Sequence, residues 1–155
     1  MKLRINYAKS APGVYEAMGA LETYLETVAV DQKLLHLLKF RVSQINHCAY
    51  CLDMHSKDLR ALGETEQRLY SLEAWQECPY YSDAERAALA WAESVTLVSV
   101  DQVPDAVYEE ARKHFSEKDL ADITLCLVAI NGWNRLSIAA RVPPGSYRSS
   151  LKPAT

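Results

Sequence analysis

Glycine and proline are scarce in this chain, which has only 5 Gly and 6 Pro in 155 residues. Helix-forming residues such as Leu, Ala, Glu, Lys and Arg are plentiful instead. No segment alternates apolar and polar residues over more than a few positions, so the sequence predicts no β-sheet. The length suits one domain with its own core, and we expect a single all-α domain over residues 1–155.

A surplus of basic residues is also missing, since the formal net charge is −3. This balance argues against nucleic acid as a partner. No window reaches the roughly 18 consecutive apolar residues of a membrane span, and the N-terminus has no apolar run typical of a signal peptide. We therefore expect a cytoplasmic protein without a membrane partner.

Apolar residues at helical spacing predict six to seven helices, and capping residues mark several of their ends. The caps are Asp31, Ser82 with Glu85, and Ser116 at N-termini, and Gly63 at a C-terminus. The expected ranges are 14–28, 31–46, 48–62, 66–75, 82–98, 104–115 and 117–141.

The last predicted helix is apolar on nearly every side between Leu120 and Ile130. A helix without a polar face must be covered all round, either by its own domain or by another subunit. The sequence thus leaves oligomerisation through this helix as an open expectation.

Two of the four cysteines lie close together in the segment "INHCAYCLDMHSKDLRALG", residues 45–63. On a helix, Cys48, Cys51 and His55 fall within about 60° of arc and form one stripe. The His55 ring tilts towards Cys51, and the positive end of the helix dipole at Cys48 favours a thiolate. The geometry suits a dithiol centre with a base beside it.

Zinc and an incidental pair of surface cysteines stay open as alternatives from the spacing alone. A structural zinc site needs four ligands, and neither Cys78 nor Cys126 has a Cys or His at ligand spacing. Cys48 and His55 are also about 10 Å apart along a helix axis, too far for one ion to hold both easily. Cys126 is expected in the core, whereas Cys78 fits either environment.

Two segments resemble the alkylhydroperoxidase D-like branch of the carboxymuconolactone decarboxylase superfamily. They are "LLKFRVSQINHCAYCLDMH" (37–55) and "NGWNRLSIAARVPPGSY" (131–147). The resemblance implies an all-helical protein that assembles into trimers or hexamers. It also implies a thiol peroxidase that needs no haem, flavin or metal cofactor.

The resemblance further assigns roles to the motif residues. Cys51 matches the nucleophile that attacks a hydroperoxide and becomes a sulfenic acid, and Cys48 matches the thiol that condenses with it. His55 matches a proton-relay residue. A dithiol reductant, such as a lipoylated protein or a thioredoxin-like donor, would then reduce the disulfide by exchange.

His36 is a departure from the family pattern. The family usually has a glutamate twelve residues before the first cysteine, where this chain has His36. A histidine carries a proton near neutral pH but is never anionic, so the relay could be rebuilt, weakened or lost. From the residues alone, His36 lies opposite the apolar stripe of Leu34, Leu38 and Val42 and resembles a surface or packing residue.

The remaining polar and aromatic positions can be explained without a functional role. His47 and Tyr50 fit a solvent-facing residue and a packing aromatic, although His47 could also lower the pKa of Cys48. The polar residues within 131–135 fit either of two interpretations. They form a hydrogen-bonding cluster at a subunit interface or in the site, or they are an ordinary polar patch. Asp53 and Lys57 are expected to form a surface ion pair.

The favoured function is a thiol-dependent peroxidase in antioxidant defence, with Cys51, Cys48, His55 and His36 as its site. A thiol–disulfide sensor or regulatory oligomer without turnover is the alternative that the His36 substitution keeps open. A zinc-binding module is the third and weaker alternative.

Overall fold

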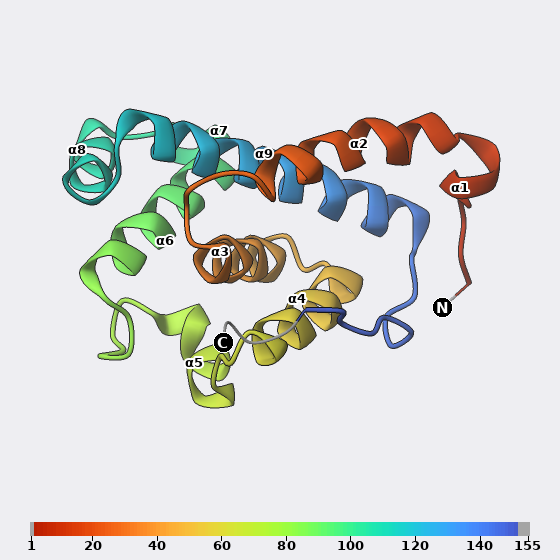
Figure 1. The fold of residues 1–155 in the computed structure, drawn as a ribbon, viewed down its shortest axis with the longest axis horizontal. Helices are drawn as coiled ribbons and strands as arrows, with labels where there is room; N and C mark the ends of the chain where they lie inside the picture. Colours follow the sequence, from red (N-terminus) through yellow and green to blue (C-terminus); the bar gives the residue numbers. More distant parts are fainter. Residues whose placement is uncertain (1, 152–155) are drawn as a thin grey trace.

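The computed structural model describes residues 2–151, and within that range it contains helices, turns and irregular segments but no strand. The helices are α1 (Tyr7–Ser10), α2 (Pro12–Leu25), α3 (Gln32–Ile45), α4 (Ala49–Ala61), α5 (Glu66–Ser71), a 3-10 turn (Leu72–Ala74), α6 (Asp83–Thr96), α7 (Val98–Asp101), α8 (Asp105–His114) and α9 (Glu117–Ala140). The all-α prediction is confirmed (Figure 1). The expected six to seven helices omit the two shortest, α1 and α7, of 4 residues each.

The predicted caps form at the helix ends. At the start of α6 the Ser82 side chain accepts from the Glu85 N–H, and the Glu85 carboxylate accepts from the Ser82 N–H. Ser116 and Asp119 form the same capping box at the start of α9. Gly63 follows α4 with a φ of 82°, in the left-handed region that glycine adopts without a steric penalty. Because these signals are local, the sequence alone locates them.

Helix α3 lies at the centre of the molecule, with α2 and α9 across one side and α4 across the other (Figure 1). The apolar stripe predicted for α3 is only one part of its buried surface. Phe40 and Ser43, on the face opposite the predicted stripe, are 8% and 0% exposed, whereas Leu34 is only half-buried. The wheel assumes a solvent-facing side, but α4, α6 and α9 all contact α3.

Helix α9 has the length and apolar composition of a membrane-crossing segment. In this molecule, however, it packs against α2, α3, α4, α6 and α8 as the longest core helix. Most of its apolar side chains are therefore covered by their own domain. Val128 and Ile138 are exceptions, with 53% and 46% of their surface exposed.

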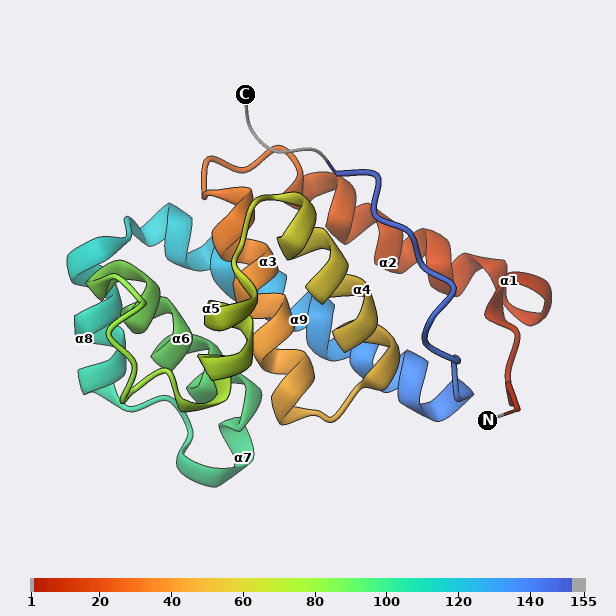
Figure 2. The same cartoon turned by 90° about the horizontal axis from the view of Figure 1, so that it is seen from below.

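The segment after α9 turns back and runs alongside α4 (Figure 2). Asp53 accepts a hydrogen bond from the Gly145 N–H at 3.0 Å, and Lys57 donates to the Tyr147 carbonyl at 3.2 Å. The predicted Asp53–Lys57 ion pair is confirmed at 2.7 Å. This pair also fixes the C-terminal segment beside the cysteine motif.

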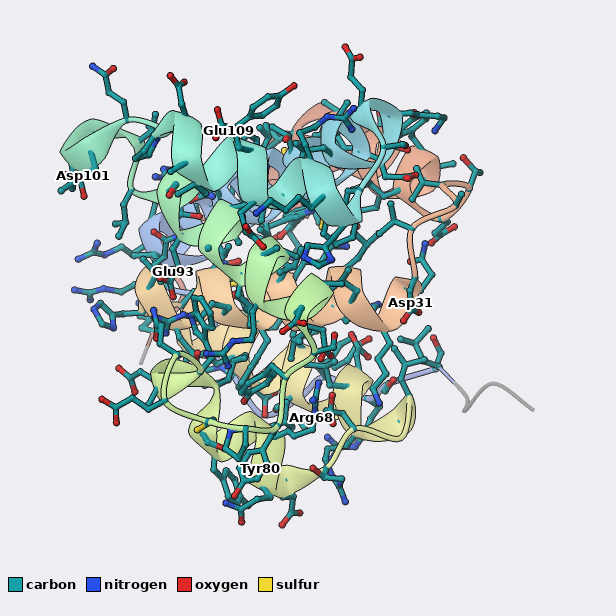
Figure 3. The ribbon with its side chains drawn as sticks, turned by 90° about the vertical axis from the view of Figure 1, so that its left-hand side faces the viewer. Asp31, Arg68, Tyr80, Glu93, Asp101 and Glu109 are labelled. Atoms are coloured by element: carbon teal, nitrogen blue, oxygen red, sulfur yellow. A yellow bond between two sulfur atoms is a disulfide. The ribbon has the colours of Figure 1, made fainter. Side chains whose placement is uncertain are left out.

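A charged cluster holds the far end of α4. Glu64 is only 2% exposed and pairs with Arg68 at 2.9 Å. Arg68 also bonds the carbonyl of Tyr80 and the carboxylate of Glu85. Figure 3 shows Arg68 and Tyr80 together at the end of the molecule formed by α5 and the loop after it. The cluster ties the end of α4 to α5 and α6.

Candidate dithiol and histidine site

A tight turn joins α3 to α4 and places the first cysteine. His47 has a φ of 55° and is exposed, which confirms the expectation of a solvent-facing side chain. The N–H of Cys48 then donates to the Ser43 carbonyl at 3.0 Å. Cys48 thereby becomes the N-cap residue of α4.

The polar residues that interrupt the apolar run of α9 anchor this turn. The Asn46 side-chain amide donates to the amide oxygens of Asn131 and Asn134, both at 2.9 Å. Asn134 is fully buried and donates to the Ser43 hydroxyl at 3.1 Å. Of the two interpretations left open for residues 131–135, the hydrogen-bonding cluster fits better, because Asn131 and Asn134 connect α9 to the α3–α4 turn and Trp133 lines the cavity described below.

Cys48 and Cys51 are joined in a disulfide with their Cα atoms 5.4 Å apart. Each is 1% exposed, so the alternative of incidental surface cysteines is wrong. Both lie at the N-terminal end of α4, where free backbone N–H groups and the helix dipole stabilise a thiolate after reduction.

Cys51 forms part of the wall of a cavity of about 680 Å³, whose lining does not include Cys48. Helices α2, α3, α4 and α9 and the C-terminal segment all contribute to the wall. His36, Tyr50 and His55 line the same cavity. Three of the four predicted site residues therefore face one space, and Tyr50 contributes to its wall rather than only to packing.

The two histidines lie side by side, with ring centroids 5.6 Å apart. Burial, followed by the nearby charges of His36 and Lys39, holds the pKa of His55 well below its usual range. Burial and then Lys39 lower the pKa of His36 to about 4. Both imidazoles are thus neutral at pH 7 and keep a free lone pair.

Asp58 is the site residue that the sequence analysis missed. It is 3% exposed, and its Oδ2 lies 3.9 Å from Nδ1 of His36 and 4.0 Å from Nδ1 of His55. Asp58 follows His55 by three residues, so the spacing on one helix face would have found it. A carboxylate from α4 therefore lies beside both histidines.

Tyr147 completes the surroundings of Asp58. Its hydroxyl donates to Oδ1 of Asp58 at 2.8 Å and leaves Oδ2 towards the histidines. Burial and this carboxylate raise the pKa of Tyr147 to about 12, so the phenol remains a donor at neutral pH. The C-terminal segment thus helps to orient Asp58.

An ion pair lies on the cavity wall. Lys39 is only 7% exposed and its Nζ lies 2.6 Å from Oε2 of Glu22. The Trp133 indole donates to the other Glu22 oxygen at 3.0 Å, and Tyr15 stacks on Trp133 with centroids 5.7 Å apart. Apolar and aromatic surface therefore surrounds a few fixed polar groups, as in sites for small organic molecules.

The other two cysteines lie outside the cavity lining. Cys126 is fully buried, as expected of a core residue. Cys78 is half-buried, and its thiol contacts the Ser71 carbonyl at 3.7 Å.

The sequence model of the carboxymuconolactone decarboxylase family matches residues 12–94. Uncharacterized protein YdfG of Bacillus subtilis (strain 168) is 44% identical over 139 residues, which are 90% of this chain and 95% of that protein. A crystal structure of ATU0492 from Agrobacterium tumefaciens, a protein of unknown function described as a candidate antioxidant defence protein AhpD, is 40% identical. It has a TM-score of 0.91, over 94% of this chain and 100% of that one.

The debrominase Bmp8 shares the fold at 20% identity, with a TM-score of 0.77 over 87% of this chain and 73% of that one. At that identity the likeness concerns the fold alone. The family model covers the cysteine motif on α4, and the two closer relatives each match at least 90% of the chain. The chain belongs to the carboxymuconolactone decarboxylase family and, within it, to the alkylhydroperoxidase D-like branch.

Proposed function

We propose that this protein is a thiol-dependent peroxidase that reduces organic hydroperoxides through a dithiol–disulfide cycle. The observation that carries the proposal is the position of Cys51. Its neighbour Cys48 is bridged to it, His55 is one helical turn away, and Cys51 and His55 line the same cavity.

The reaction begins with both cysteines reduced. Neutral His55 takes the proton of the Cys51 thiol, and the thiolate attacks the terminal oxygen of the hydroperoxide. The O–O bond breaks, the leaving alkoxide takes the proton from His55, and an alcohol is released. Cys51 is now a sulfenic acid, so the peroxide has gained the two electrons that the sulfur has lost.

Cys48 completes the first half of the cycle. Its sulfur attacks the Cys51 sulfenic sulfur, the S–S bond forms, and the departing hydroxide leaves as water with the Cys48 proton. A dithiol donor then attacks the disulfide and is itself oxidised to a disulfide, which restores both thiols.

Asp58 supports the proton transfer in this mechanism. When His55 becomes cationic, a carboxylate 4.0 Å from its Nδ1 stabilises the charge in a buried setting where water cannot. Asp58 therefore performs the role of the glutamate that the family usually has at position 36. Neutral His36 lies beside Asp58 as a second proton acceptor.

The proposal extends to the partners and the location of the protein. A lipoylated protein or a thioredoxin-like donor would supply the dithiol, the chain would act as a trimer or hexamer, and it would work in the cytoplasm. The description of ATU0492 as a candidate antioxidant defence protein supports the same role.

A redox sensor is the alternative that one observation favours. His36 stands where the family usually has a carboxylate, so thiol oxidation without efficient turnover is compatible with the same disulfide. Peroxidase and sensor differ in a direct measurement, because only a peroxidase consumes hydroperoxide over many cycles.

The test is hydroperoxide consumption with dihydrolipoamide as the dithiol donor. We expect turnover in the wild type, loss of turnover in Cys51→Ser, and wild-type rates in the matched control Cys78→Ser, whose thiol lies outside the cavity lining. Absence of wild-type turnover, with the Cys48–Cys51 disulfide still forming and being reduced, would replace the peroxidase by the sensor.

A further inference from the structure

Three side chains of metal-ligand type converge where α3 faces α4. A ring nitrogen from each of His36 and His55 and a carboxylate oxygen of Asp58 all lie within 4.8 Å of one another. His55 and Asp58 come from one face of α4, and His36 comes from the adjacent face of α3. None of the three is a cysteine, so this donor set differs from the zinc alternative raised by the sequence.

The imidazole nitrogens in this cluster are buried without partners. Within residues 2–151, neither ring nitrogen of His55 has a hydrogen bond, although the side chain is only 4% exposed. Nδ1 of His36 is likewise buried and unbonded in the described range. A buried polar atom without a partner destabilises the folded protein, so a ligand that uses these lone pairs would stabilise it.

The charge of the buried Asp58 carboxylate also favours a bound cation. No Lys or Arg side chain of the described residues lies within ion-pair distance of this carboxylate. The nearby Lys39 is already paired with Glu22 at 2.6 Å. Buried carboxylates are normally paired or bound to a metal, and the Tyr147 hydroxyl supplies a hydrogen bond but no positive charge.

We propose that His36, His55 and Asp58 form a binding site for a divalent transition-metal ion such as zinc or cobalt. Two imidazoles and one carboxylate select such ions over magnesium or calcium, which prefer all-oxygen sites. The three residues also line the cavity of about 680 Å³, which gives the ion an entry path and leaves a fourth position for water.

The geometry requires only small movements. Ligand atoms around a tetrahedral zinc ion lie roughly 3.3 Å apart when each bond is about 2.0–2.1 Å. The Asp58 oxygen is 3.9 and 4.0 Å from the two histidine nitrogens, and all three donor atoms lie within 4.8 Å of one another, so each would have to move inward by about 0.5 Å. Tyr147 would orient the ligating carboxylate from behind, as outer-shell partners of metal sites do.

Under the proposed function, the same His55 lone pair would accept either a thiol proton or the metal ion. Metal binding and peroxide reduction would then exclude each other. The binding itself does not depend on that function, because it can be measured on the oxidised protein, in which Cys48 and Cys51 cannot act as ligands.

The test is a titration of metal-free, oxidised protein with Co²⁺, followed by displacement with Zn²⁺. We expect one ion per chain, with visible absorption typical of nitrogen and oxygen ligands. His36→Ala, His55→Ala and Asp58→Asn should each weaken binding at least ~10-fold, since even the loss of an outer-shell partner costs 10–100-fold.

The chain offers matched controls, because its other two histidines, His47 and His114, lie outside the cavity lining. His47→Gly, which tolerates the φ of 55°, and His114→Ala should bind the ions as the wild type does. The ring-proton NMR signals of His36 and His55 in wild-type protein should move with zinc while those of His47 and His114 stay in place, which needs no variant to fold.

Several results would overturn the proposal. These are no binding by the wild type at millimolar metal, equal binding by folded site and control variants, or a sulfur-to-cobalt charge-transfer band that assigns the ion to Cys78. Shifts confined to the signals of His47 or His114 would likewise assign the ion to the surface.

Discussion

At the scale of single residues, the distance along the chain decides which parts of the site can be predicted. Cys48, Cys51 and His55 are spaced at three and four residues, so their common face follows from helix geometry alone. Asp58 follows the same helical spacing, so its place on this face can also be predicted from the sequence. The approach of Tyr147, 89 residues further on, depends on the path of the C-terminal segment, which no local pattern encodes.

His36→Glu tests whether position 36 belongs to the proton relay. We expect this variant to retain or raise peroxide turnover, because a carboxylate beside His55 stabilises its cationic form better than an imidazole does. Initial rates with dihydrolipoamide measure the effect, and His36→Ala is the matched control. A folded His36→Glu protein with a rate at or below that of His36→Ala would remove position 36 from the relay.

Cys126 should be the least reactive thiol of the reduced protein. Burial raises its pKa to about 12, so only about 0.01% would be thiolate at pH 8, and the thiolate is the nucleophile. Peptide mapping after brief treatment with iodoacetamide should find Cys126 unmodified in native protein and modified in denaturant. Cys78, which is half-buried, is the internal comparison, and equal native labelling of the two would contradict the expectation.

At the scale of elements, capping residues predict helix ends well and neighbouring helices decide the rest. The ends of α6 and α9 follow directly from Ser82 and Ser116. Helix α3 shows the opposite case, because its second buried face exists only once the neighbouring helices α4, α6 and α9 cover it. The polar side of a helix wheel is a prediction of solvent exposure only for a helix on the surface.

Ser116→Ala should lower the free energy of unfolding by about 1 kcal/mol, because the α9 capping box loses the oxygen that accepts from the Asp119 N–H. Urea denaturation followed by circular dichroism measures the change. Ser99→Ala, at an exposed position within α7, is the control and should stay within about 0.5 kcal/mol of the wild type. Equal midpoints for the two variants would show that the cap contributes nothing.

At the scale of the whole molecule, the domain covers most apolar side chains of α9 but leaves some of them exposed to solvent. The sequence could not separate coverage by the domain from coverage by a second subunit, since both demand the same apolar residues. In the structure the domain covers most apolar side chains of the helix but leaves Val128, 53% exposed, and a shallow groove between α2 and α9. Gly13, Ala17 and Gly132 line that groove, and small residues of this kind let helices approach closely.

This exposed part of α9 is where we expect subunits of a trimer or hexamer to meet. Val128→Glu should reduce the mass of the assembly measured by light scattering, because association would bury an uncompensated charge. Stability within one chain should change little, since Val128 is exposed and glutamate favours helix more than valine does. Tyr70→Glu, at a 74% exposed position on α5, is the control and should assemble as the wild type does. If Val128→Glu assembled with the same mass as the wild type, the subunits would have to meet at another surface. If the wild type itself were monomeric, the exposed apolar surface of α9 would not be a contact between subunits.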